Sequence, residues 1–229
     1  MNKRTLIAVP SHEMVYARFM ESLMNMEKPA GTGFAMVTNT LIDTARNLIA
    51  VEAVKAGFDQ VLWIDSDMII PSDALIRLSE DMNDGREFVS ALYFTRKEPS
   101  VPCIHSDIMW EIKDDGWVNT SGDIYKNYLR DQLFEIAGCG FGCVMTSTGL
   151  LKRMIDKYGA PFSPLMGMGE DTSFCFRVRK NNIKMFCDSR VKCGHIGQKV
   201  FNEDGYILSE IARNRYEKIK GQKLPRKPE

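Results

Sequence analysis

The sequence has no surplus of charge of either sign, because 30 Lys and Arg residues balance 30 Asp and Glu residues. Dedicated nucleic-acid-binding domains usually carry a basic excess, so we expect no nucleic-acid partner. The chain also lacks any run close to the roughly 18 consecutive apolar residues that a transmembrane helix needs. Its opening apolar run, residues 6–9, ends at Pro10 and is too short for the core of a signal peptide. We therefore expect a cytoplasmic protein without a transmembrane segment.

The sequence contains no Cys-x-x-Cys pair, which is the spacing that makes a structural zinc site persuasive. Without an export signal, its cysteines are expected to be reduced thiols. A zinc-stabilised binding module, with Cys187, Cys193 and His195 and either Cys139 or Cys143 as ligands, remains an alternative. The six cysteines are Cys103, Cys139, Cys143, Cys175, Cys187 and Cys193.

Strand-like and helix-like apolar patterns alternate over residues 1–95. This alternation predicts an α/β fold with a mixed, mainly parallel, Rossmann-like sheet flanked by helices. Gly57 marks the end of the second helix, since glycine commonly follows a helix C-terminus. The predicted strands cover residues 6–9, 34–37, 61–64 and 88–93, and the predicted helices cover residues 15–26, 41–56 and 71–82.

The pattern changes after residue 100, where short alternating strands and turns replace the helices up to residue 146. No linker composition interrupts the chain, so we interpret residues 1–229 as a single domain. Further helices are predicted at residues 150–158, 172–180 and 203–220, with short strands at residues 183–186 and 191–193.

Two carboxylates, Asp65 and Asp67, follow directly on an apolar strand that contains no other charge. Ligands of open α/β sheets bind beyond the carboxyl ends of the strands. Carboxylates at that position can hold a hard cation that keeps waters and binds substrate phosphates. An ordinary strand-to-helix turn, in which Asp67 or Ser72 caps the next helix, is the structural alternative.

Three polar residues of the preceding helix, Asp43, Arg46 and Asn47, share one face because they lie at positions i, i+3 and i+4. The planar fork of an arginine suits a phosphate or a nucleobase carbonyl. A solvated helix face with a local Asp43–Arg46 pair is the competing interpretation.

Two later motifs carry further candidates. Glu170 and Asp171 open a helix, where the helix dipole favours acidic residues, and one of them could act as general base for an acceptor hydroxyl. His195 lies between Gly194 and Gly197, which predicts an exposed turn after a short strand. A neutral imidazole at such a place is a good ligand for manganese or zinc.

In their order and spacing these motifs resemble those of the GT-A-fold glycosyltransferases, in particular the family-two-like proteins of bacteria and their phages. The resemblance extends from Leu6 to Gly197. Its motifs are Asp43-x-x-Arg46-Asn47, Leu62-Trp63-Ile64-Asp65-Ser66-Asp67-Met68, Leu92-Tyr93-Phe94, Gly138-Cys139-Gly140-Phe141-Gly142, Gly169-Glu170-Asp171 and Gly194-His195.

The resemblance implies a metal-dependent transferase of nucleotide-diphosphate sugars. Asp65 would contact ribose or metal, Asp67 would bind the metal, and His195 would complete the shell of a Mn²⁺ or Mg²⁺ ion. Asp171, with Glu170 beside it, matches the acidic position that serves as base in inverting members. The donor-binding residues implied by the same motifs are Pro10, Ser11, Asp43, Arg46, Asn47, Asp65, Ser66, Gly138 and Gly140.

The implied organisation is a nucleotide- and metal-binding half (about residues 1–98), an acceptor half (about 99–200) and a C-terminal helix and tail (201–229). The acidic residue that many members use to grip uracil is not evident near Thr38 and Asn39, so the donor can be of the UDP or the GDP type. The acceptor can be a carbohydrate, a lipid-linked molecule or a protein, and a homo-oligomer is possible. A sugar nucleotidyltransferase is disfavoured because no glycine-rich loop follows the first strand, and a non-catalytic sugar-nucleotide binder remains an alternative.

Overall fold

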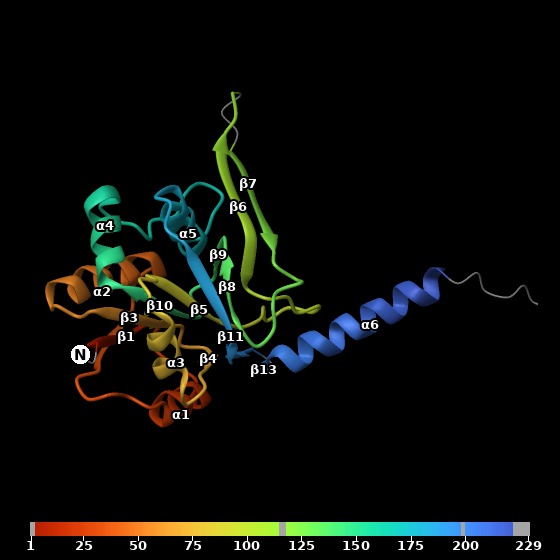
Figure 1. Ribbon diagram of the computed structural model, residues 1–229, viewed down its shortest axis with the longest axis horizontal. Coiled ribbons are helices and arrows are strands. Elements are labelled where there is room, and N and C mark those ends of the chain that lie inside the picture. Colours follow the sequence, from red (N-terminus) through yellow and green to blue (C-terminus); the bar gives the residue numbers. More distant parts are fainter. Residues whose placement is uncertain (1–2, 115–117, 198–199, 222–229) are drawn as a thin grey trace, which may run out of the picture.

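A seven-stranded sheet forms the centre of the protein in the computed structural model, which describes residues 3–114, 118–197 and 200–221 (Figure 1). Five strands run in one direction, and β10 and β8 run in the opposite direction. The predicted mixed, mainly parallel sheet is therefore confirmed. In spatial order the strands are β2 (Gly33–Val37), β1 (Thr5–Pro10), β3 (Gln60–Ile64), β10 (Cys143–Ser147), β5 (Phe88–Leu92), β11 (Met185–Lys192) and β8 (Leu133–Ile136).

The central strands β3, β10 and β5 are mostly apolar because both faces of the sheet are covered. In β3, Val61 and Trp63 point into one core cluster, whereas Leu62 and Ile64 point into the other. Trp63 is fully buried, and its indole Nε1 donates a hydrogen bond to Thr146 Oγ1 at 2.9 Å. The alternation of side chains between two faces follows from the two-residue period of a strand.

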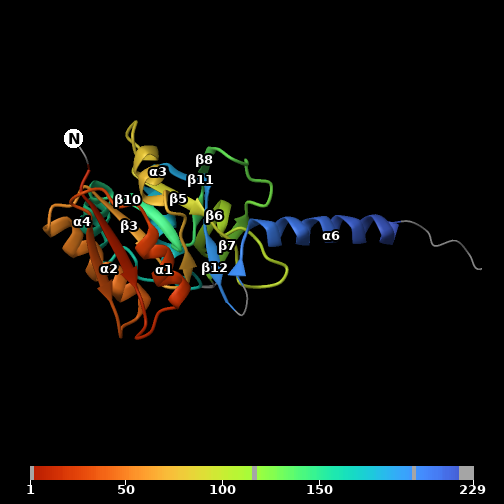
Figure 2. The ribbon, with the colours of Figure 1, turned by 90° about the horizontal axis from the view of Figure 1, so that it is seen from below.

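Helices cover both faces of the sheet (Figures 1 and 2). The first core cluster is completed by α2 (Ile42–Lys55), α4 (Thr148–Tyr158) and α5 (Glu170–Lys180). The second is completed by α1 (Ala17–Asn25) and α3 (Ala74–Asp81). Gly57 adopts a φ of 69° directly after α2, as its place in the sequence predicted.

The last helix, α6 (Glu203–Gly221), packs its first turn on the domain and then extends away from it (Figures 1 and 2). Tyr206 anchors that turn, because its ring stacks on Phe94 at a centroid distance of 4.9 Å and its hydroxyl donates to the carbonyl of Lys126. In the part of the chain that the structure describes, neither α6 nor any other helix has the length and apolar character needed to cross a membrane.

Two small sheets lie beside the central one. One contains β7 (Val118–Ile124), β6 (Ile104–Ile112) and β9 (Gly138–Cys139), and the β6–β7 hairpin stands out from the body in Figure 1. The other contains β13 (Val200–Phe201), β12 (Gly194–Ile196) and β4 (Met68–Ile69). In this second sheet His195 pairs with Met68, and Ile196 N donates to Asp67 O at 2.7 Å. The strand pairing thereby places His195 next to the Asp65–Asp67 segment.

Two sequence predictions in this region are wrong. His195 does not lie on an exposed turn but in β12, where its side chain is 13% exposed. The strands predicted at residues 183–186 and 191–193 overlap the two ends of one continuous strand, β11 (Met185–Lys192). The middle of β11 is polar in sequence, which favours a turn over a strand. The burial of Ser189 is compensated by two hydrogen bonds: its Oγ accepts from Gln132 N and donates to the carbonyl of Leu129.

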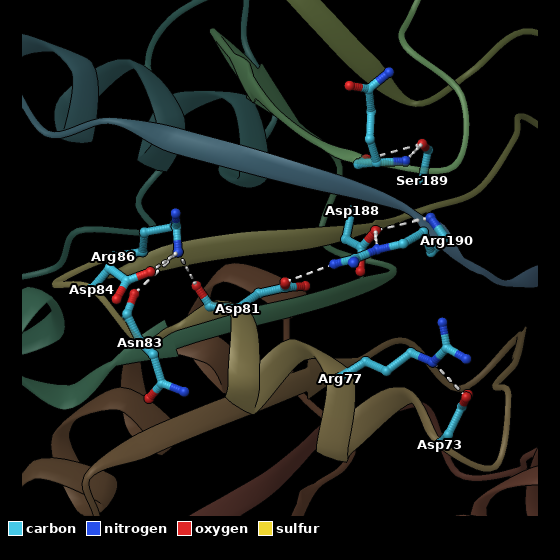
Figure 3. A network of polar contacts seen from close by, with 10 residues as sticks. Asp73, Arg77, Asp81, Asn83, Asp84, Arg86, Asp188, Ser189 and Arg190 are labelled. Atoms are coloured by element: carbon cyan, nitrogen blue, oxygen red, sulfur yellow. Dashed lines mark hydrogen bonds and ion pairs between the residues drawn. The ribbon is translucent and has the colours of Figure 1, made fainter.

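A buried acidic pair joins α3 to β11 (Figure 3). Arg190 binds Asp188 through Nε at 2.8 Å and Asp81 through Nη2 at 2.9 Å. Asp188 is fully buried, and one oxygen of each aspartate has no hydrogen-bond partner. Burial and the adjacent Asp188 carboxylate raise the pKa of Asp81 to about 7. Asp81 therefore carries a proton for much of the time near neutral pH.

Candidate functional site

A cavity of about 670 Å³ opens beyond the carboxyl ends of β1 and β3, which are neighbours in the sheet. Four segments line it: residues 10–16 after β1, residues 40–45 at the start of α2, residues 65–67 after β3, and Arg96. This is the edge of an open α/β sheet where ligands bind. Of the predicted site residues, Pro10, Ser11, Asp65, Ser66 and Asp67 line the cavity.

Arg46 is a buried arginine that holds two acidic residues of the site in place. Its side chain is 1% exposed, and it binds Asp65 Oδ1 at 2.5 Å and Glu170 Oε1 at 2.8 Å. The guanidinium also lies over the ring of Phe141, 5.1 Å from the centroid. Burial would lower the pKa of Arg46, but Asp65 and Glu170 outweigh it and raise the pKa, so the group stays charged. The interpretation of α2 as a solvated face with a local Asp43–Arg46 pair is wrong.

The two aspartates of the Asp-Ser-Asp segment meet different partners. Burial raises the pKa of Asp65, and Arg46 offsets part of that effect. Burial would also raise the pKa of Asp67, but His195 and Arg96 outweigh it and lower the pKa. Asp67 is therefore ionised at neutral pH, while the Arg46 contact fixes the position of Asp65.

His195 faces Asp67 with an orientation set by the backbone. Its Nδ1 lies 2.7 Å from the carbonyl oxygen of Phe94, and its Nε2 lies 3.5 Å from Asp67 Oδ2. A carbonyl can only accept, so Nδ1 donates its proton to the Phe94 carbonyl, and Nε2 is the ring nitrogen that faces Asp67. Histidines that bind metals commonly have their second nitrogen held in this way by a carbonyl.

Arg96 is a site residue that sequence reasoning missed. It lies on the loop after β5 and binds Asp67 Oδ2 through Nη1 at 2.8 Å. The Leu92-Tyr93-Phe94 motif ends two residues before it, so a cation next to a recognised motif was the available indication. That indication is weak, because exposed arginines are common in the loops of proteins.

The acidic residues at the start of α5 do not line the cavity and are joined to the site through Arg46, which binds Glu170. Asp171 Oδ1 accepts from Thr172 N at 2.6 Å, in keeping with the expected role of an acidic first turn. A Cβ built on Gly140 would lie 3.4 Å from Asp171 Oδ2 and 2.0 Å from Tyr93 Oη, so only glycine fits there. Burial raises the pKa of Glu170, and Arg46 opposes this effect.

Five predicted donor-binding residues are not among those that line the cavity: Asp43, Arg46, Asn47, Gly138 and Gly140. Asn47 Oδ1 accepts from Phe162 N at 3.0 Å and thereby holds α2 to the segment before α5. Gly138 is buried, with room for no Cβ because Ile108 Cδ1 would lie 2.2 Å away. Asp43 lies in the first turn of α2 and is not among the residues that line the cavity. These positions indicate structural contacts for Asn47 and Gly138.

The geometry suits a divalent cation that takes only part of its shell from the protein. Asp67 and His195 offer one oxygen and one nitrogen, while Asp65 Oδ1 is already bound to Arg46. Across the described ranges, no group of three or more His, Cys, Asp or Glu side chains is arranged to hold a metal. Mg²⁺ usually binds through one or two carboxylates, waters and substrate phosphates, so two or three protein ligands suffice.

The alternative zinc site is not formed by the cysteines. Cys187 belongs to the first core cluster, together with Cys139, whereas Cys193 belongs to the second, together with Cys143. All of these are free thiols, and His195 points to Asp67 and Phe94 instead. The buried cysteines thus act as small apolar residues.

No family model matches the chain, and no curated protein matches it. Several solved structures, in contrast, are similar to this chain. A197 from STIV matches with a TM-score of 0.63 and 16% identity, covering 85% of this chain and 86% of that one. GalNAc-T7 with UDP, GalNAc and Mn²⁺ matches with a TM-score of 0.57 and 9% identity, covering 85% of this chain and 44% of that one. This chain therefore has a GT-A-like fold, as its motifs predicted.

Proposed function

We propose that this protein is a divalent-metal-dependent glycosyltransferase, which moves a sugar from a nucleotide-diphosphate donor to an acceptor hydroxyl. One observation carries the proposal: Asp67, which lines the cavity, has its Oδ2 only 3.5 Å from His195 Nε2, although the two residues are 128 positions apart in the sequence. A structural ion pair would not need the nearby carboxylate of Asp65 or a cavity of about 670 Å³. Both are needed to hold a nucleotide and its cation.

Asp67 and His195 would hold a Mn²⁺ or Mg²⁺ ion, and Asp65 and Ser66 would face the donor. When bound, such an ion neutralises the charge of the diphosphate leaving group as a Lewis acid. Arg46 keeps Asp65 in place through its buried ion pair, so the carboxylate pays little ordering entropy when the donor binds. Pro10 and Ser11 line the part of the cavity beyond β1, where the nucleoside would lie.

Asp171 would accept the proton of the acceptor hydroxyl. It lies at the start of α5, close to Gly140 and within electrostatic reach of Arg46 and Asp65. Because Arg46 also holds Glu170, the neighbouring carboxylate of Asp171 is left available to act as base. If Asp171 is the general base, the reaction inverts the configuration at the anomeric carbon. The fold shared with GalNAc-T7, whose structure contains UDP, GalNAc and Mn²⁺, supports this class of donor.

The test is calorimetric titration of Mn²⁺, and then of UDP and GDP with Mn²⁺ present, followed by assays of sugar-nucleotide hydrolysis. We expect Asp67→Asn and His195→Ala each to lose metal-dependent nucleotide binding and hydrolysis. Asp84→Asn is a matched control, because Asp84 is 81% exposed and its positive φ is one that asparagine tolerates.

Normal metal and nucleotide binding in both site variants would refute the proposed metal site. Binding of metal and nucleotide by the wild-type protein without hydrolysis or transfer would instead favour the non-catalytic sugar-nucleotide binder.

A further inference from the structure

Arg96 holds the same carboxylate oxygen that the proposed cation needs. Its Nη1 lies 2.8 Å from Asp67 Oδ2, and His195 Nε2 faces that oxygen at 3.5 Å. A cation bound between Asp67 and His195 would therefore compete with the guanidinium for Oδ2. Two positive charges cannot both stay close to one oxygen without mutual repulsion, so the arrival of a cation favours departure of the arginine.

The side chain of Arg96 can leave without movement of its loop. It is 48% exposed, in contrast to Arg46, which is 1% exposed and held by two carboxylates. The ends of its loop are held together: Thr95 N donates to Val101 O at 2.9 Å, and Ser100 Oγ donates to Thr95 O at 2.9 Å. Rotation of the side chain is thus the only motion that the exchange requires.

The cavity itself offers Arg96 a second partner when a nucleotide diphosphate is bound. Arg96 lines the cavity together with Asp65, Ser66 and Asp67. The site contains two arginines and four carboxylates, so its excess of negative charge favours binding of a divalent cation. A diphosphate that then binds to this cation adds new negative charge close to Arg96. The planar fork of an arginine matches two phosphate oxygens, which makes the released guanidinium a suitable phosphate ligand.

We propose that Arg96 exchanges partners during donor binding: it neutralises Asp67 in the empty site and transfers to the diphosphate once a divalent cation has taken Asp67. This inference rests on the proposed function and names Arg96 as a donor-binding residue of the same site. It predicts that loss of the guanidinium affects the two ligands in opposite directions, which a merely structural role would not do.

The experiment compares the wild-type protein with Arg96→Ala, Arg96→Lys and the control Lys97→Ala by calorimetry. Lys97 is the exposed neighbour, so its removal changes the net charge equally, yet it does not line the cavity. Removing the competitor from a half-exposed ion pair should make Arg96→Ala bind Mn²⁺ alone about threefold more tightly. Loss of a charge-assisted phosphate contact should make it bind UDP or GDP, at saturating Mn²⁺, about tenfold more weakly.

Arg96→Lys keeps the charge without the fork, so its Mn²⁺ affinity should resemble that of the wild type while nucleotide affinity stays reduced. If Arg96→Ala and Lys97→Ala behave alike in both titrations, the partner exchange is refuted while the proposed function stands. If the wild-type protein binds neither Mn²⁺ nor a nucleotide, the proposed function fails and this inference fails with it.

Discussion

Replacement of Arg46 by methionine should destabilise the protein in a pH-dependent manner. Methionine fills much of the space but leaves Asp65 and Glu170 as two neighbouring carboxylates whose side chains are only 27% and 17% exposed. Removing one partner of a buried ion pair typically costs about 3–5 kcal/mol. Because both carboxylates keep some contact with solvent, we expect a loss of about 3 kcal/mol at pH 7. For a chain of this length that corresponds to a decrease in Tm of roughly 6–12 °C.

The sign of the pH dependence follows from the two carboxylates. Arg46 lowers the pKa of Asp65 and of Glu170 against the effect of burial, so its removal lets both folded-state pKa values rise further. A group whose pKa is raised by folding loses its stabilising contribution as pH rises. The difference between wild type and Arg46→Met should therefore be largest near pH 8 and should shrink towards pH 4.

Urea unfolding at pH 4.5, 6 and 8 measures this difference directly. Arg77→Met is the matched control, because it breaks the exposed pair with Asp73 (Figure 3) and should cost less than about 1 kcal/mol at any of these pH values. The triple variant with Asp65→Asn and Glu170→Gln should regain most of the lost stability. A loss below 1 kcal/mol, or a loss independent of pH, would show that Arg46 does not compensate buried charge.

Three further changes probe other parts of the structure. Asp81→Asn should raise the free energy of unfolding by about 2 kcal/mol at pH 8 but hardly at pH 4. The pKa of Asp81 is raised from 3.8 to about 7 beside Asp188, which at about 1.4 kcal/mol per pKa unit is worth about 4 kcal/mol, and loss of the ion pair with Arg190 offsets part of that gain; urea unfolding at both pH values checks this. Gly140→Ala should cost about 1–3 kcal/mol because its Cβ would lie 2.0 Å from Tyr93 Oη, and combination with Tyr93→Phe should recover part of the loss; a thermal melt that shows no loss would refute the close contact. Asp171→Asn should keep donor binding in a calorimeter but lose at least 100-fold in transfer rate, the low end of the usual contribution of a general base; persistent transfer would remove Asp171 from that role.

Much of the fold is predictable because it depends on local pattern. The apolar runs that became β1, β3 and β5 are read correctly, since strands buried on both faces admit little else, and the run of the edge strand β2 is found as well. The helices are also predicted within a few residues of their observed bounds, because helical spacing of apolar residues is a local pattern as well. The error in β11 has the opposite cause, because Asp188 and Ser189 are polar but buried. The partner of Ser189 comes from a distant part of the chain, and Asp188 is paired with Arg190, which is itself bound to the distant Asp81.

The site was only partly predictable. Asp65 and Asp67 are visible in the sequence because they end an apolar strand, and the topology of a parallel sheet makes such positions ligand sites. Arg96 was missed because its importance depends entirely on its contact with Asp67. Asn47 and Gly138 belong to matching motifs, yet a motif records which residues are present and not which of them face the cavity.

The sequence by itself determined the layered α/β architecture and the set of side chains from which a cation and diphosphate site is proposed, because periodicity and residue chemistry are properties of the chain alone. Only the tertiary structure decided which of these side chains meet. The pairing of β12 with β4 brings His195 to Asp67, and the burial of α2 turns Arg46 towards Asp65 and Glu170. These contacts join residues up to 128 positions apart, and no local pattern encodes such a distance.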